Sequence, residues 1–166
     1  MFYGCTGLTT APELQATTLA PYCYSSMFRG CTSLTTAPAL SVTTLANGCY
    51  NSMFNGCTSL AQAPELPATT LASNCYQYMF SACTSLTQAP ALSAATLVSR
   101  SYQSMFDGCA SLNNIKCLAT SGINSTNCNN WVRGVAASGT FVAVSGVTGW
   151  TTGVSGIPSG WTRVNQ

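Results

Sequence analysis

Ten cysteines are the residues of this sequence with the widest chemical potential. Eight of them recur at intervals of 26 residues, in one column of five (Cys5, Cys31, Cys57, Cys83 and Cys109) and one of three (Cys23, Cys49 and Cys75). Columns with odd numbers of members cannot pair completely. Within one repeat, most of a predicted helix separates Cys23 from Cys31, whereas a disulfide needs Cα atoms within about 7 Å. We therefore expect buried structural thiols, with some disulfides as the alternative.

The sequence offers few metal ligands other than its cysteines. The sequence contains no His and no C-x-x-C motif. A zinc site would need an all-Cys or carboxylate arrangement that the cysteine columns do not suggest. We expect neither a metal ion nor another cofactor.

Acid–base catalysis would have to use the three carboxylates, Glu13, Glu65 and Asp107. Glu13 and Glu65 lie two repeats apart, which corresponds to about 10 Å if each repeat adds one strand spacing. That distance is near the range for an inverting glycosidase pair, but no aromatic-lined cleft or third polar group is indicated. We therefore interpret the carboxylates as solvated surface groups and the chain as a protein without enzymatic activity.

Charged residues make up only 5% of the chain, so uncharged polar residues must cover most of its surface. The five cations are scattered: Arg29, Arg100, Lys116, Arg133 and Arg163. Nucleic-acid binding draws on clustered positive charge, so we expect no nucleic-acid partner. No apolar run of about 18 residues is present, and no basic segment with an apolar h-region follows Met1, so we expect no membrane span and no export signal within this sequence.

A 26-residue repeat organises the chain and positions these residues. A Met-Phe pair recurs at the same interval, beginning at Met1, Met27, Met53, Met79 and Met105. Two leucine columns accompany it, Leu8, Leu34, Leu60, Leu86 and Leu112, and Leu14, Leu40, Leu66, Leu92 and Leu118. The interval continues to Trp131 and Gly134 and fades beyond them. Apolar columns of this length predict successive coils that stack and share one core.

One repeat, residues 27–52, predicts two short elements. Residues 34–40 are typical of a short strand, because Pro38 restricts the hydrogen bonds of a ladder. Thr43 or Thr44 can cap a following helix, in which five residues have the spacing of one helical face: Leu45, Cys49, Tyr50, Met53 and Phe54. Gly56 is well placed to end that helix.

The predicted fold is an α/β repeat solenoid, leucine-rich-repeat-like, of about five coils. It has a parallel sheet on one side, short helices on the other and a C-terminal cap. Residues 1–134 form the solenoid, and residues 135–166 form the cap, a loop-rich segment with several Gly residues that carries Trp150 and Trp161.

The recurring Met-Phe-x-Gly-Cys-x-Ser-Leu, clearest at residues 27–34 and 53–60, resembles the BspA-like, or Treponema-type, leucine-rich repeats of bacterial surface proteins. The similarity covers about residues 1–134, and residues 156–161 resemble tails on such proteins from gut Bacteroidetes. The unit differs from the commoner family unit in its greater length and its Ala-Pro strand centre. The resemblance implies a surface-displayed or secreted adhesion module without catalytic residues, and related repeats also occur on phage appendages.

Repeat proteins bind through positions that vary between coils on a shared face. The strand side offers seven such candidates for ligand binding: Thr10, Glu13, Thr36, Gln62, Glu65, Gln88 and Asn114. The helix side offers a second set, Tyr22, Gly48, Asn74 and Arg100. We favour the strand side because short polar side chains make a flat hydrogen-bonding surface, while mere solvation of both sets is the alternative.

These observations favour a non-enzymatic binding or adhesion module that is extracellular or on the cell surface and recognises a protein or glycan on a host or neighbouring cell. The second hypothesis is a structural subunit of a fibre, filament or phage appendage. It rests on Met1, which falls within a repeat and leaves the N-terminal coil open for upstream residues, self-association or a partner protein.

Overall fold

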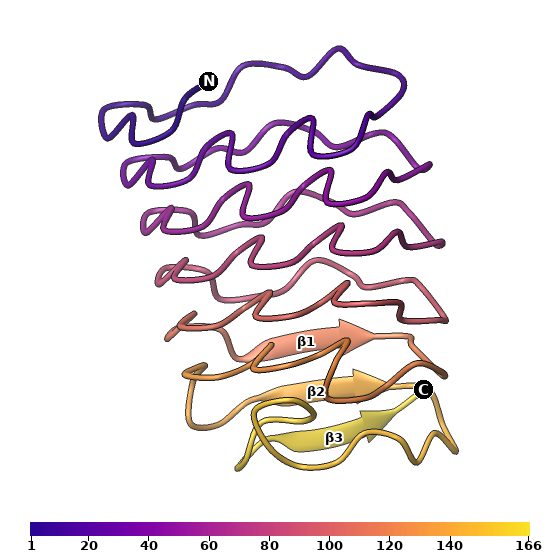
Figure 1. Cartoon of the computed structure of the whole chain (residues 1–166). Helices are drawn as coiled ribbons and strands as arrows, with labels where there is room; N and C mark the ends of the chain where they lie inside the picture. Colours follow the sequence, from indigo (N-terminus) through magenta and orange to yellow (C-terminus); the bar gives the residue numbers. More distant parts are fainter.

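The computed structural model describes residues 1–166 and shows a backbone that winds in successive coils, each lying on the one before (Figure 1). Three short strands form near the C-terminal end: β1 (Asn114–Cys117), β2 (Thr140–Ala143) and β3 (Thr162–Asn165). They make a parallel sheet in the order β1-β2-β3, in which Asn114 lies beside Thr140 and Thr140 beside Thr162. Each strand belongs to a different coil.

The predicted fold class, an α/β leucine-rich-repeat-like solenoid with short helices, is wrong, because the chain contains no helix. The segment expected to be helical is a series of tight turns. Met53 N–H donates to the Tyr50 carbonyl three residues earlier, and the next N–H, that of Phe54, donates to the Met79 carbonyl of the following coil. This alternation holds from residue 48 to residue 57, where no N–H reaches the carbonyl four residues back as it would in an α-helix.

Every fourth residue of this segment has the left-handed backbone conformation, with positive φ, and this conformation produces the turns. In this coil Gly48, Ser52 and Gly56 have φ values of 59°, 54° and 75°. A right-handed helix cannot pass through such residues. Because a four-residue period is close to the 3.6 residues of a helical turn, the turns bury the same apolar face that predicted a helix, including Cys49, Tyr50, Met53 and Phe54.

Prolines limit the sheet to the end of the stack. Each of the first four coils has a proline at the centre of the strand-side segment: Pro12, Pro38, Pro64 and Pro90. Proline has no N–H to donate to a ladder, so isolated bridges such as Thr10↔Thr36 and Gln62↔Gln88 are the only strand-like pairing in this part of the chain. Lys116 in β1 and Val142 in β2 replace the proline, and there continuous strands form.

The leucine column that ends at Leu118 was predicted in the wrong register. Gln88 bridges Asn114, 26 residues later, but Leu92 bridges Cys117, only 25 residues later. One residue is therefore missing from this stretch of the fifth coil. Cys117 takes the fully buried place that the repeat assigned to Leu118, which is half-buried.

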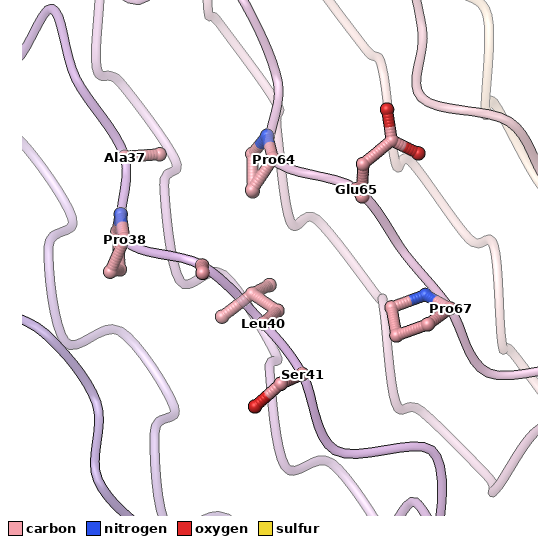
Figure 2. Close-up of a pocket in the computed structure, with 8 residues that line it drawn as sticks. Ala37, Pro38, Leu40, Ser41, Pro64, Glu65 and Pro67 are labelled. Carbon is pink, nitrogen blue, oxygen red and sulfur yellow. The ribbon is translucent and has the colours of Figure 1, made fainter.

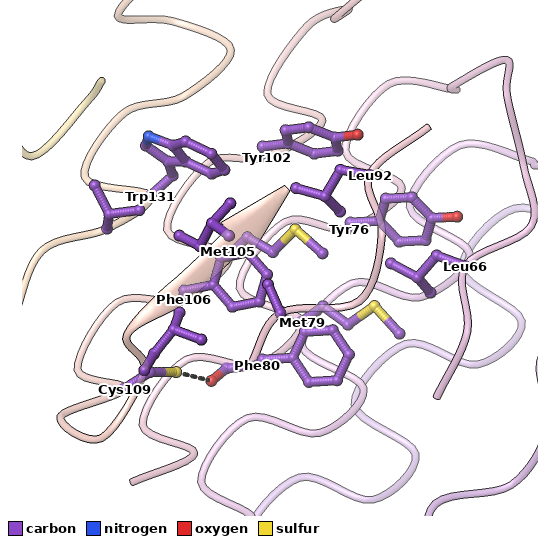
Figure 3. Close-up of a cluster of buried hydrophobic side chains, with 14 of the residues drawn as sticks. Leu66, Tyr76, Met79, Phe80, Leu92, Tyr102, Met105, Phe106, Cys109 and Trp131 are labelled. Carbon is purple, nitrogen blue, oxygen red and sulfur yellow. Dashed lines mark hydrogen bonds between the residues drawn. The ribbon is translucent and has the colours of Figure 1, made fainter. Parts of the chain in front are cut away.

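Aromatic side chains stacked from coil to coil form the centre of the core. The rings of Phe54 and Phe80 lie 5.6 Å apart and almost parallel, and those of Tyr50 and Tyr76 lie 6.1 Å apart. Figure 3 shows the two ladders with the methionines between them. Both ladders end on Trp131, which contacts Tyr102 and Phe106.

Residues beyond the repeat continue this core. The ring of Trp150 stacks on Trp131 at 5.3 Å, and Trp131 Nε1–H donates to the Gly156 carbonyl at 2.8 Å. Trp161 Nε1–H donates to the Ala136 carbonyl at 2.7 Å. The C-terminal segment thus covers the last coil with large aromatic side chains. None of the chain is folded as a long apolar helix of the kind that crosses a membrane.

Candidate binding faces

The predicted strand-side column lies along one side of the stack. Parallel bridges set Thr10 beside Thr36, Gln62 beside Gln88, and Gln88 beside Asn114. Asn114 is half-buried, and the other four are exposed. No bridge joins Thr36 to Gln62, so the column consists of two groups separated where the second and third coils adjoin.

Glu13 and Glu65 are both exposed, and neither takes part in an ion pair. Each borders a different depression on the strand side, Glu13 between the first and second coils and Glu65 between the second and third. The two carboxylates therefore do not share a cleft in which one could act as acid and the other as base.

The larger depression is a groove of about 460 Å³ between residues 37–41 of the second coil and Pro64, Glu65 and Pro67 of the third (Figure 2). Its walls are mainly Ala, Pro and Leu side chains, and Glu65 is the charged residue among them. The neighbouring groove, about 360 Å³, repeats this chemistry one coil earlier with Ala11, Glu13 and Leu14 on one wall. Prolines border both grooves, at the places where they prevent a continuous ladder.

Backbone groups beside these grooves are left without partners. None of the N–H groups of residues 39–47 and 65–73 donates a hydrogen bond within the chain. Several of these residues are exposed, Ala39 and Glu65 among them, so their amides are open to solvent or to a bound chain. The strand side therefore combines apolar grooves, isolated negative charge and unused main-chain donors.

The opposite side, made by the tight turns, carries the second predicted set. Asn74 Nδ2–H donates to Asn47 Oδ1 at 3.0 Å, and Asn47 Nδ2–H donates to the Tyr22 hydroxyl at 3.4 Å. Gly48 lies under the Tyr22 ring, where an added Cβ would come within 2.3 Å of a ring carbon. Arg100 is exposed. Three of the four predicted residues thus belong to one local arrangement around Tyr22.

A second amide ladder on the turn side was not predicted. Asn51 Nδ2–H donates to Gln77 Oε1 at 2.8 Å, and Gln77 Nε2–H donates to Gln103 Oε1 at 2.7 Å. Beside it lies a pocket of about 500 Å³ whose walls include Arg29 and Tyr78. The signal was present in the sequence, because the three amides occupy the same position of consecutive repeats.

Most of the thiols are structural. All ten cysteines are free, and eight of them are buried. Burial raises the pKa of Cys57 to about 12, and it also raises the pKa of Cys83 well above its ordinary value. A neutral buried thiol is a poor nucleophile and a poor metal ligand. No three side chains of the His, Cys, Asp or Glu type lie close enough to hold a metal ion.

The third carboxylate, Asp107, forms a bidentate pair with Arg133. Arg133 Nε and Nη2 donate to its two oxygens at 2.9 and 2.6 Å. Arg133 is largely exposed, so the pair adds little stability, but it occupies both oxygens of Asp107. Each of the three carboxylates is thus separate from the other two.

Comparison of the chain with protein-family models, with curated proteins and with solved structures found no match. The BspA-like resemblance of the repeat motif is therefore still a prediction from the sequence.

Proposed function

We propose that this chain is a non-enzymatic binding module, displayed on a cell surface or secreted, whose strand side takes an extended polypeptide segment carrying a basic side chain. The observation that carries the proposal is the groove between residues 37–41 and Pro64, Glu65 and Pro67. It is apolar along its walls and negative at one point, and unpaired backbone N–H groups adjoin it.

Each feature matches one property of such a ligand. An extended chain offers carbonyl groups to the free N–H groups of residues 65, 66 and 68–73, as in other complexes that use main-chain recognition. Its apolar side chains fill the Ala- and Pro-lined space. A Lys or Arg of the ligand lies against Glu65, which has no cation of its own.

The separation of the three carboxylates supports a role in binding without catalysis. Glu13 and Glu65 border different grooves, and Asp107 is held by Arg133. General acid–base catalysis needs a group of suitable pKa within reach of the reacting atoms, usually with a second group to complement it. The buried thiols, with pKa values raised to about 12 at Cys57 and Cys75, do not supply a nucleophile at neutral pH.

Selection of a random dodecapeptide library on the immobilised chain tests this function. Enriched peptides should contain Lys or Arg among small apolar residues. Binding should shift the backbone amide resonances of residues 65, 66 and 68–73 in a ¹⁵N spectrum. Glu65→Gln should weaken the binding of the selected peptides about tenfold. A charge-assisted hydrogen bond contributes about 1.5–3 kcal/mol, and the lower limit applies because Glu65 is exposed to solvent.

Ser99→Lys is the matched control. It changes the net charge by the same one unit as Glu65→Gln but lies at an exposed position outside both grooves. Equal binding of the selected peptides to the wild-type chain and to Glu65→Gln would contradict the proposal. Enrichment of acidic peptides, or amide shifts confined to the turn side, would contradict it as well.

A further inference from the structure

The turn side carries a second pocket, distinct from the strand-side grooves. It has a volume of about 500 Å³, and three successive coils contribute its lining: Arg29, Asn51, Ser52, Asn55, Gln77, Tyr78 and Ser81. Hydroxyl and carboxamide groups dominate this set. Its single cation, Arg29, lies 5.7 Å from the centre of the Tyr3 ring, so its charge is already partly engaged.

The carboxamides of the pocket are held in fixed orientations. Gln77 accepts a hydrogen bond from Asn51 and donates one to Gln103, and Ser52 Oγ–H donates to Asn51 Oδ1 at 2.9 Å. A carboxamide has two N–H donors, and the ladder uses one from Asn51 and one from Gln77. Each of these two residues therefore keeps one N–H for a ligand, and little side-chain entropy is lost when the ligand binds.

Tyr78 is an exception in its column. The equivalent residues of the neighbouring coils are Ser52 and Ser104, and all three have positive φ, 56° at Tyr78. A large side chain in this conformation is uncommon and costs about 1–2 kcal/mol. Since serine occupies the position in the adjacent coils, the fold does not require the half-buried ring of Tyr78. Strain of this kind tends to persist at functional sites.

We propose that this pocket binds an uncharged oligosaccharide. Sugar hydroxyls both donate and accept, which matches the free N–H groups and the oxygens of the carboxamides. The C–H face of a pyranose ring packs on an aromatic ring such as that of Tyr78. Each coil supplies one amide to the ladder, from Asn51, Gln77 and Gln103 in turn. Because the coils stack about 4.8 Å apart, the spacing between successive amides is close to the length of one sugar unit. The saccharide therefore runs along the stack.

Other ligand classes fit the pocket less well. A phosphate or a nucleic acid needs clustered positive charge, and Arg29 is the one cation here. A protein partner would need large apolar anchors in the centre of its interface. No carboxylate lines the pocket, so the bound saccharide is held and not cleaved.

The test is titration of the ¹⁵N-labelled chain with four neutral hexasaccharides, cellohexaose, mannohexaose, laminarihexaose and N-acetylchitohexaose, and with a sulfated heparin hexasaccharide. At least one neutral probe should shift the side-chain NH₂ resonances of Asn51 and Gln77. Tyr78→Ser should weaken that probe at least fivefold while the thermal midpoint is unchanged or higher, because serine is the residue that this position uses in neighbouring coils.

Tyr22→Ser is the matched control, since Tyr22 is also a left-handed tyrosine on the turn side but does not line the pocket. It should bind the probe as the wild type does. Three outcomes would overturn the inference: no neutral probe binds at millimolar concentration, only the heparin hexasaccharide binds, or Tyr78→Ser binds as well as the wild type. The result is independent of the strand-side proposal, because Glu65→Gln should leave saccharide binding unchanged.

Discussion

The thiol of Cys57 donates a hydrogen bond to the backbone carbonyl oxygen of Phe28 in the preceding coil, with 3.1 Å between the sulfur and the oxygen. The same oxygen accepts the N–H of Cys31 within its own coil. The pattern recurs in the next two coils, where Cys83 donates to the Phe54 carbonyl and Cys109 donates to the Phe80 carbonyl. Figure 3 shows the bond from Cys109 to Phe80. Each of these thiols therefore joins one coil to the next only while it is protonated.

Alkaline pH should destabilise the fold, because its buried thiols resist losing their protons. Burial raises the pKa of Cys57, Cys109 and Cys117 from 9.0 to about 12. The unfolded chain therefore loses these protons at a lower pH than the folded chain. Their contribution to stability is complete below pH 9 and falls between pH 9 and 12, by about 1.4 kcal/mol per pH unit for each thiol. Urea unfolding at pH 7, 8, 9 and 10 measures the decline.

The matched variant for this prediction is Cys117→Ala, which lacks one of the buried thiols. Above pH 9 its free energy of unfolding should fall less steeply with pH than that of the wild type, by about 1.4 kcal/mol per pH unit. Ala119→Gly, at a fully buried residue without a thiol, is the control and should leave the slope unchanged. The pH prediction would be wrong if stability were constant from pH 8 to 10.

Ala82→Gly should stabilise the chain by about 0.5–1 kcal/mol. Ala82 has φ of 58°, and glycine occupies the equivalent place in the neighbouring coils, Gly56 and Gly108. Removing Cβ relieves a conformational cost of about 1–2 kcal/mol in the folded chain. Glycine also gives the unfolded chain more conformational freedom, and this offsets about half of the gain. Thermal unfolding measures the change.

The reverse substitution, Gly56→Ala, should destabilise the chain by about 1 kcal/mol. This cost is conformational, because the nearest atoms to an added Cβ are 3.7 Å away. Gly7→Ala serves as the control, since a Cβ there meets nothing within 4 Å and its φ is not positive. A loss of stability in Ala82→Gly would show that the left-handed turns are not formed as described.

Trp131 and Trp150 should respond differently to replacement by phenylalanine. Trp131 Nε1–H donates to the carbonyl of buried Gly156, whereas the buried Nε1 of Trp150 has no partner. Trp131→Phe leaves that carbonyl unpaired in the core and should cost about 2–4 kcal/mol. Trp150→Phe removes an unsatisfied donor and should cost less than about 1 kcal/mol. Urea unfolding of both variants tests the contrast, and an equal loss in the two would contradict it.

Pro64→Val should extend strand pairing into the third coil. Valine restores an N–H at a position where Val142 already forms part of β2. We expect slower hydrogen exchange at residues 63–66 and a gain of about 1 kcal/mol for each ladder hydrogen bond that forms. The groove beside Glu65 should narrow, so peptides selected on the wild type should bind several-fold less tightly. Unchanged exchange and unchanged binding would show that proline is not what separates these coils.

The sequence alone determined most of the side chains that share the core. The 26-residue interval identified Met53, Phe54 and Leu60 as members of apolar columns, and all three are fully buried. It also identified Thr10, Thr36, Gln62 and Gln88 as a polar column, and these residues are exposed along one side of the stack. Burial follows from side-chain type and repeat position, and both can be read along the chain.

Only the tertiary structure decided where the backbone hydrogen bonds go. An N–H such as that of Phe54 has two competing acceptors, a carbonyl four residues back or one in the next coil, and the second becomes available only when the coils stack. The spacing of apolar residues indicates which side chains are buried, but it does not indicate which carbonyl accepts each backbone N–H. A series of four-residue turns therefore has the same apolar pattern as a helix. The missing residue near Cys117 has the same origin, because the pairing of Leu92 with Cys117 is a relation between coils. The repeat aligns Asn51, Gln77 and Gln103, but only the stacked coils decide which amide donates to which.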